Sequence, residues 1–310
     1  MFVIEARRAL ATLLRCDAMP KHARSVHLTL IAVQLCFASL AVVGREALAH
    51  IPANAIVLCR VGCAALLFAA IARFRDNARI ERADLPRLVL CALLGVVVNQ
   101  TLFVNGLARS SAINASVLGT TIPIFSAIFA VAAGIERMRI ARLTGIALAL
   151  FGALFLVHVD RFSWDDAHAV GNLMILCNCA SYGLFLVLVR PLTAKIPPFT
   201  LVAGLFVCAL PGVLALGVPS LLAVVPHITM REIGYLAFII AVPTVGAYGL
   251  NQVAMRRAEP SLVASYIYLQ PLFATVGAAL RLGERLDIRT AIAAPLVLLG
   301  VFQCARSEAT

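Results

Sequence analysis

Ten long runs of apolar residues constrain the fold of this chain more strongly than any other feature of its sequence. A helix that crosses the hydrocarbon layer of a membrane needs about 20 mostly apolar residues, because that layer is about 30 Å thick and a helix rises about 1.5 Å per residue. The runs lie at 27–44, 54–71, 88–107, 113–134, 143–158, 171–189, 199–217, 233–255, 263–280 and 291–305. The sequence therefore predicts an all-α integral membrane protein with ten transmembrane helices.

The composition also fits a lipid environment. Hydrophobic residues make up 62% of the 310 residues and charged residues 13%, with a mean hydropathy of +0.97. Soluble domains have about 25% charged residues. Most of the nine cysteines lie inside the apolar runs, and none forms a CxxC pair. We interpret them as packing residues, and we expect no metal and no cofactor.

The basic residues indicate how the chain is oriented. If the N-terminus is cytoplasmic and the spans alternate, 18 of the 26 Lys and Arg residues lie in cytoplasmic segments and seven in outer loops. This is the positive-inside pattern, so the net charge of +11 indicates a lipid bilayer as partner and no nucleic acid. Both termini are predicted to be cytoplasmic. The loop at 281–289, with three arginines on the outer side, is an exception.

Residues 1–24 are predicted to form a cytoplasmic N-terminal segment. Three arginines interrupt its apolar residues and no cleavage site follows, so it does not read as a signal peptide. It is either a basic interfacial helix or the result of a start assigned at Met1 in place of Met19. Only two of the 26 basic residues are lysines, which is typical of a GC-rich genome. We therefore expect a multi-pass protein of a bacterial inner membrane, with its oligomeric state left open.

One motif occurs twice and divides the chain into two halves. Four residues recur 148 residues later: Pro123, Phe125, Glu136 and Ile140 match Pro271, Phe273, Glu284 and Ile288. An Asn-Gln pair at 99–100 also returns at 251–252. The sequence therefore predicts two repeats, at 25–158 and 169–305, with five spans each. Because five is odd, the second repeat starts on the opposite side of the membrane, which predicts an inverted repeat of the kind found in secondary transporters.

These features resemble the EamA family of the drug/metabolite transporter superfamily. The resemblance rests on the Pro-x-Phe…Gly-x-Glu-Arg pattern that ends in GIER at 134–137, on the LTGIALALFGALFLV that follows, and on their recurrence in a ten-span chain. It covers nearly all of residues 27–305 and implies an exporter or exchanger of amino acids or other small metabolites. It also implies an arginine in the second span and a cavity lined by spans one, three, four, six, eight and nine. The second copy departs in having Ala293 where the first has Gly145.

Arg60 is the only charged residue well inside a predicted span. An arginine at the centre of a membrane helix costs about 2.5–3.5 kcal/mol, so it normally faces protein or water. Two interpretations stay open. Either Arg60 has a structural partner or reaches the membrane surface, or it contacts the substrate or a gate.

Uncharged polar residues inside the spans are further candidates for lining a transport cavity. Asn and Gln are unfavourable against lipid, so we expect them to face the bundle interior, where they either join helices or line the cavity. With Arg60, the candidates are Gln34, Asn99, Gln100, Asn178, Tyr182, Asn251, Gln252, Tyr266 and Gln270. Helix kinks are predicted at Pro123 and Pro271, because proline removes a backbone hydrogen bond.

All fifteen acidic residues lie in loops, in tails or in the last turn of a span. Among them, Glu136 and Glu284 are expected to anchor helix ends at the interface or to form salt bridges in loops. Proton-coupled pumps usually carry an intramembrane carboxylate or histidine, so we hypothesise transport without a proton-binding carboxylate at the midplane.

The sequence thus favours a secondary transporter that exports an amino acid or a similar neutral or zwitterionic small molecule by alternating access. One alternative is a drug or nucleotide-sugar carrier, and another is a non-transporting scaffold or receptor. An enzyme is not expected, because the chain has no HExxH, no GxSxG and no cluster of His and Asp residues.

Overall fold

Helices form almost all of the structure, a computed structural model that describes residues 21–110, 118–136, 139–156, 166–273 and 288–309, together with residues 115 and 276. The α-helices are α2 (Lys21–Leu48), α3 (Ala53–Arg75), α4 (Leu85–Ala92), α5 (Asn99–Arg109), α7 (Ile122–Ala132), α8 (Ile140–Leu156), α9 (Asp166–Lys195), α10 (Pro198–Val224), α11 (Met230–Ile240), α12 (Ala247–Met255), α13 (Pro260–Ser265) and α15 (Ile288–Ala309). Two π-helical segments are η2 (Leu93–Val98) and η5 (Ala241–Gly246). Short 3-10 helices are η1 (Arg82–Asp84), η4 (Val225–His227) and η6 (Tyr266–Tyr268). The described residues contain no strand.

Many of these helices are apolar and long enough to cross a membrane. Five such stretches are Ala53–Arg75, Arg82–Arg109, Ala169–Lys195, Pro198–Val224 and Met230–Met255. Four shorter apolar helices are Ser25–Leu40, Ile122–Ala132, Ile140–Phe155 and Ile292–Cys304. The prediction of an all-α membrane protein is thereby confirmed. The span predicted at 263–280 is described only as far as residue 273 and at residue 276.

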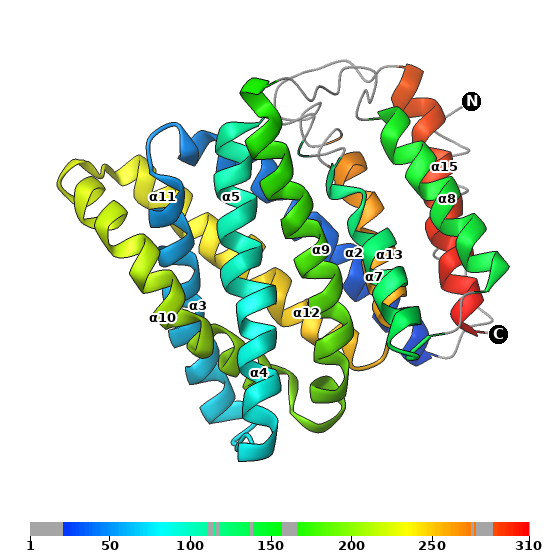
Figure 1. The fold of residues 1–310 in the computed structure, drawn as a ribbon, viewed down its shortest axis with the longest axis horizontal. Helices are drawn as coiled ribbons and strands as arrows, with labels where there is room; N and C mark the ends of the chain where they lie inside the picture. Colours follow the sequence, from blue (N-terminus) through cyan, green and yellow to red (C-terminus); the bar gives the residue numbers. More distant parts are fainter. Residues whose placement is uncertain are drawn as a thin grey trace.

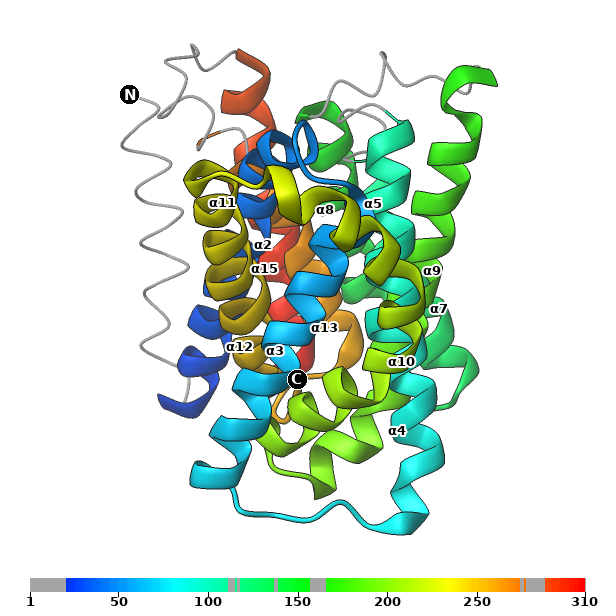
Figure 2. The ribbon, with the colours of Figure 1, turned by 90° about the vertical axis from the view of Figure 1, so that its left-hand side faces the viewer.

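Two helices begin earlier than the sequence predicted. α2 begins at Lys21, inside the segment 1–24 that we expected to precede the first span, while residues 1–20 lie outside the described residues. α9 begins at Asp166, three residues before the predicted start of the second repeat at 169. α2 begins and α15 ends at the same end of the bundle, as Figures 1 and 2 show.

Helices from the two halves of the chain pack against each other throughout the bundle. α3 packs along α10, and α8 packs along α15, a pair that stands at one side of the bundle in Figure 1. α9 from the second half contacts α5 and α7 from the first, and α2 from the first half contacts α12 and α11 from the second, as can be followed in Figure 2. The two halves therefore share one bundle.

Glycines allow α8 and α15 to approach closely. A Cβ atom at Gly300 would lie 2.4 Å from the backbone nitrogen of Ala149 and 2.6 Å from the carbonyl oxygen of Gly145. In turn, a Cβ atom at Gly145 would lie 2.9 Å from the carbonyl oxygen of Gly300. Lipid provides no hydrophobic force between helices, so close van der Waals contact between small residues is what holds such a crossing together.

A π-helical segment interrupts the same span in each half. η2 joins α4 to α5, and η5 joins α11 to α12 with its first residue 148 positions after that of η2. This is the spacing of the repeated Pro–Glu motif. Gly95 in η2 lies directly against α9, since a Cβ atom there would be 2.4 Å from Cδ2 of Phe185. Short π segments inside α-helices are frequent at functional sites, and both of these precede residues of the cavity described below.

Candidate functional site

A cavity of about 200 Å³ lies between the helices. α2, α3, α5, α9 and α12 line it, together with the residues that lead into α7 and those of α13 and the turn after it. Much of the wall is apolar or aromatic, with Phe37, Phe103 and Leu186 as examples, and amide side chains interrupt it. The lining therefore comes from both halves of the chain.

The structure brings most of the predicted candidate residues to this cavity. Eight of the ten line it: Gln34, Arg60, Asn99, Gln100, Asn178, Tyr182, Asn251 and Gln270. Tyr266 does not, and its hydroxyl lies 2.6 Å from Nδ1 of His27. Gln252 does not line it either. Its side chain is buried, and neither amide atom has a hydrogen-bond partner among the described residues.

The two predicted kink positions differ in their surroundings. The helical turn before α7 ends at Gly119, and residues 120 and 121 form a turn, so Pro123 lies at the start of a new helix. Proline is favourable there, because the first turn of a helix leaves its backbone N–H groups unpaired in any case. Pro271 lies in the helical residues 269–273 that follow η6, and it lines the cavity. The chain thus breaks before Pro123, where we expected a bent but continuous helix.

Hydrogen bonds between lining residues join the two halves. Nε2 of Gln270 donates to Oε1 of Gln34 at 2.7 Å, across 236 residues of sequence. Nδ2 of Asn178 donates to the carbonyl oxygen of Asn99 at 2.7 Å. These amides therefore both join helices and line the cavity, the two roles that the sequence left open.

The repeat relation at the cavity differs from the one that the Asn-Gln pairs suggested. Gln100 and Tyr248 each lie two residues after a π-helical segment, and Nε2 of Gln100 donates to the hydroxyl of Tyr248 at 3.4 Å. Asn251 lies about one helical turn beyond the position equivalent to Asn99, and its Nδ2 donates to the hydroxyl of Tyr182 at 3.3 Å.

Arg60 lies in the cavity wall and is held in place from one side. The residue is 3% exposed, and its Nε donates to Oγ1 of Thr244 at 2.8 Å. The hydroxyl of Thr244, in η5, donates in turn to the carbonyl oxygen of Ile239 at 2.7 Å. No carboxylate among the described residues forms an ion pair with Arg60. Of the described residues that line the cavity, Arg60 alone carries a full charge.

Sequence reasoning missed the phenylalanines of the wall and the partner of Arg60. Phe37 and Phe103 line the cavity, and the ring of Phe37 meets that of Tyr248 edge-on with centroids 5.7 Å apart. A phenylalanine in an apolar span gives no signal that distinguishes a cavity from lipid or core. The contact of Thr244 with Arg60 was not predictable either, because the sequence alone does not place Thr244 beside α3.

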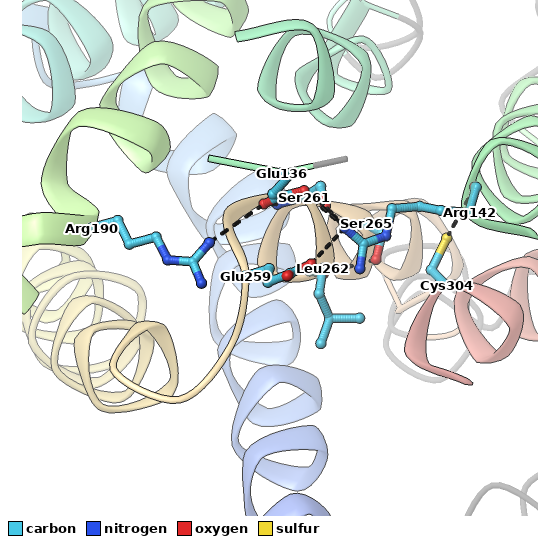
Figure 3. Close-up of polar contacts among 8 residues, drawn as sticks. All are labelled: Glu136, Arg142, Arg190, Glu259, Ser261, Leu262, Ser265 and Cys304. Atoms are coloured by element: carbon cyan, nitrogen blue, oxygen red, sulfur yellow. Dashed lines mark hydrogen bonds and ion pairs between the residues drawn. The ribbon is translucent and has the colours of Figure 1, made fainter. Parts of the chain in front are cut away.

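A second, buried polar cluster lies where α8 and α13 begin, and Figure 3 shows it. Nη1 of Arg142 lies 2.8 Å from Oε2 of Glu136 and 2.6 Å from Oε2 of Glu259, and it also donates to Oγ of Ser261 at 2.8 Å. Glu136 accepts hydrogen bonds from both the backbone N–H and the hydroxyl of Ser261. Arg190 of α9 lies 3.9 Å from Glu136. The cluster thus ties the chain after α7 to three other helices.

Glu136 was expected at the membrane interface or in a loop salt bridge. It does form a salt bridge, but its side chain is only 3% exposed, so the pair with Arg142 is buried. Its counterpart in the second repeat, Glu284, lies outside the described residues.

Comparison with known proteins matches each half of the chain to the same family. The EamA-like transporter family matches residues 24–158 and again 169–304. An uncharacterized transporter of Methanothermobacter thermautotrophicus is 27% identical over 230 residues, which are 73% of this chain and 66% of that protein. One of Archaeoglobus fulgidus is 26% identical over 242 residues, or 76% and 82%. A WAT1-related protein of Arabidopsis thaliana is 23% identical over 320 residues, or 92% and 86%.

The fold also has a counterpart among solved structures. A protein crystal structure superposes on this chain with a TM-score of 0.76 and 17% sequence identity, covering 92% of this chain and 99% of the other. The likeness shows a shared fold. The chain spans just under two thirds of the first relative named above and more than four fifths of the other two.

Proposed function

Because this chain belongs to the EamA-like transporter family, we propose that it is a secondary transporter that carries a small metabolite through the central cavity. One observation carries this proposal: the cavity is lined by residues from both matched repeats, as a site between two moving halves would be. Amide side chains in an otherwise apolar wall suit a small organic solute with a few polar groups.

The size of the cavity favours a small metabolite. Sites for drug-sized ligands enclose roughly 300–1,000 Å³, whereas this cavity encloses about 200 Å³. A nucleotide sugar would also bring several negative charges, which the single positive charge of Arg60 would not balance. An amino acid or another small solute fits both the volume and the lining.

Alternating access between two inverted halves is the mechanism that we infer for this transporter. Contacts between the halves come in equivalent pairs: α3 with α10 and α8 with α15 join corresponding spans. In the same way, the contact of α5 with α9 corresponds to that of α12 with α2. Two similar halves in opposite orientation give two similar arrangements, one open to each side of the membrane. In that scheme, the cluster of Glu136, Arg142 and Ser261 closes one end of the bundle.

The orientation and direction form part of the same proposal. The excess of basic residues in alternate segments supports cytoplasmic termini, and the scarcity of lysine supports a bacterial inner membrane. We infer export as the direction of transport. Coupling to a proton-binding carboxylate at the midplane is not part of the mechanism, since none of the described lining residues is acidic.

Radiolabelled-solute counterflow in proteoliposomes tests the proposal. We expect saturable counterflow for at least one amino acid or similar metabolite, and we expect it to fall at least tenfold in the double variant Asn99→Ala, Asn251→Ala, because both residues line the cavity. Gln303→Ala is the matched control, since this amide bonds to Thr144 and does not line the cavity.

Two results would count against it. Counterflow that persists in the folded double variant would move the site away from this cavity. Absence of counterflow for every solute, in protein that elutes as a folded species, would remove the transport function itself.

A further inference from the structure

The cavity presents an arginine whose charge the described part of the protein leaves unbalanced. Burying an ionised group is unfavourable unless another charge and hydrogen bonds compensate it. Arginine cannot avoid the cost by losing its proton, because its guanidinium stays charged in proteins. Within the described residues, Arg60 has one hydrogen bond, from Nε to Thr244, and no carboxylate partner.

The geometry leaves one edge of the guanidinium available. A guanidinium carries five N–H donors in a fixed plane, and the bond to Thr244 uses the one on Nε. Thr244 is itself fixed by its bond to the carbonyl oxygen of Ile239, so it orients the plane of Arg60 as well as accepting from it. The two Nη groups form the pair of parallel donors that matches a carboxylate.

The surroundings of Arg60 indicate which kind of anion could bind to its guanidinium. The cavity has no second cation among the described lining residues, so a single negative charge is balanced and a phosphate dianion is not. The rings of Phe37, Phe103, Tyr182 and Tyr248 share the same cavity and suit an apolar or aromatic body. The amides of Gln34 and Gln270 already bond to each other, so Arg60 is the strongest polar group that a solute in the cavity could contact.

We propose that Arg60 binds the carboxylate of the transported solute, and that Thr244 positions Arg60 for this. This inference rests on the proposed transport function. The solute class is then a small monocarboxylate with an apolar body, which includes apolar amino acids but excludes neutral solutes that lack an acidic group. Specificity comes from the anionic end, while the aromatic wall tolerates different bodies.

Matched carboxylate and amide probes test this on the purified full-length protein. The pairs are benzoate and benzamide, phenylacetate and phenylacetamide, hexanoate and hexanamide, and L-phenylalanine and its amide. A ligand that binds only the folded state raises the unfolding temperature, so the shift reports binding. We expect at least one carboxylate to raise the unfolding temperature of the wild type, and its amide to bind about 10- to 100-fold more weakly, as loss of a charge-assisted contact implies.

Variants assign the effect to Arg60. Arg60→Gln should remove the preference for the carboxylate, and Arg60→Lys should retain only part of it, because an ammonium keeps the charge without the paired donors. Thr244→Val should weaken carboxylate binding and leave amide binding unchanged. Arg109→Gln is the control for general attraction by surface charge, since Arg109 is exposed at the end of α5 and should keep the full preference.

Several outcomes would overturn the inference: equal protection by acid and amide, a preference that survives in Arg60→Gln, no protection by any carboxylate, or protection by chloride alone. If Arg60→Gln does not fold, Arg60→Lys and Thr244→Val decide. Counterflow separates this inference from the proposed function. Transport of neutral solutes that ignores Arg60 would leave the transporter and remove the carboxylate site, whereas no counterflow at all would remove both.

Discussion

Two residues that lie outside the cavity, Glu136 and Arg142, show how strongly a buried pair depends on both of its members. Both are nearly fully buried, and Glu136 also holds the N-terminus of α13 through Ser261. Removing one member of a buried pair costs about 3–5 kcal/mol when the other charge is left without a partner, but here Arg142 would keep Glu259. We therefore expect Glu136→Gln to lower the free energy of unfolding by about 2–3 kcal/mol, between the values for an exposed pair and for an unpaired buried charge, measured by denaturant unfolding in detergent micelles.

Glu259→Gln is the matched comparison, because Glu259 contacts the same arginine but its side chain is 31% exposed. Exposed ion pairs contribute about 0–1 kcal/mol. We expect a loss well below that of Glu136→Gln. Equal losses in the two variants would show that the burial of Glu136 has no energetic weight.

At the residue scale, the position of a side chain was predictable where its polarity and its place within a span determine whether it faces lipid or protein. Gln34, Asn178 and Gln270 were expected in the bundle interior because amides are unfavourable against lipid, and the structure places them there. Arg142 escaped notice because it precedes its predicted span and looks like any basic residue near a membrane surface. Its role depends on Ser261 and Glu259, more than a hundred residues away, and no local pattern encodes that meeting.

The crossing of α8 with α15 gives a prediction at the scale of the element. A side chain at Gly300 would meet backbone atoms of α8, which cannot move aside as a flexible side chain could. Gly300→Leu should therefore separate the two helices and destabilise the protein by roughly 2–4 kcal/mol, as strong overpacking does. Measurement of the unfolding temperature, with size-exclusion chromatography as a check on folding, would show this.

Gly234→Ala serves as the control, because a Cβ atom there would meet nothing within 4 Å. Alanine lowers the conformational freedom of the unfolded chain, so this change in α11 should leave stability unchanged or raise it by about 0.4–1 kcal/mol. A loss of stability in Gly234→Ala that matched that of Gly300→Leu would contradict the packing argument.

At the scale of the element, the existence of the spans was predictable and their interruptions were not. A continuous apolar run reflects the thickness of the membrane, so α3 and α10 each begin within one residue of the predicted start, while both extend beyond the predicted end, α10 as far as Val224. The π-helical segments η2 and η5 read as ordinary apolar helix in the sequence. The sequence predicted a kink at Pro123 in a continuous helix, whereas the structure has a turn at residues 120 and 121, before α7 begins at Ile122.

The opposite orientation of the two halves is a prediction about the whole molecule. α2 and α9 are the first helices of the two repeats, so the chain should leave them on opposite sides of the membrane. His50, just after α2, and Ala194, near the end of α9, are both exposed. In a variant without the native cysteines, His50→Cys and Ala194→Cys should react with a membrane-impermeant thiol reagent from opposite sides.

Vesicles of both orientations make the labelling experiment complete. We expect His50→Cys to be labelled in right-side-out vesicles and Ala194→Cys in inside-out vesicles, with permeabilised vesicles as the control for reactivity. Labelling of both positions from the same side would contradict the inverted arrangement.

For the whole molecule, the repeated motif was sufficient to predict two similar halves, which the family match also covers separately, and five spans in each half stay a prediction. The sequence could not predict which helices of one half contact which of the other. Pairs such as α8 with α15 depend on where small residues coincide across a crossing. The Asn-Gln pairs suggested that Asn99 and Asn251 are equivalent positions of the two repeats. In the structure, Asn251 lies about one helical turn beyond the position equivalent to Asn99.

The two π-helical segments carry a consequence for insertions and deletions. A π-helical turn holds one residue more than the α-helical turn it replaces, so deleting a residue within 93–98 converts the segment to a regular helix. The wide turn takes up the extra residue, so α5 should keep its present face towards the cavity after that deletion. A deletion within α4 has no such turn to absorb it and should rotate the residues beyond it by about 100° around the helix axis. A change of one residue in chain length should therefore be tolerated better within the π-helical segment than in the regular helix before it.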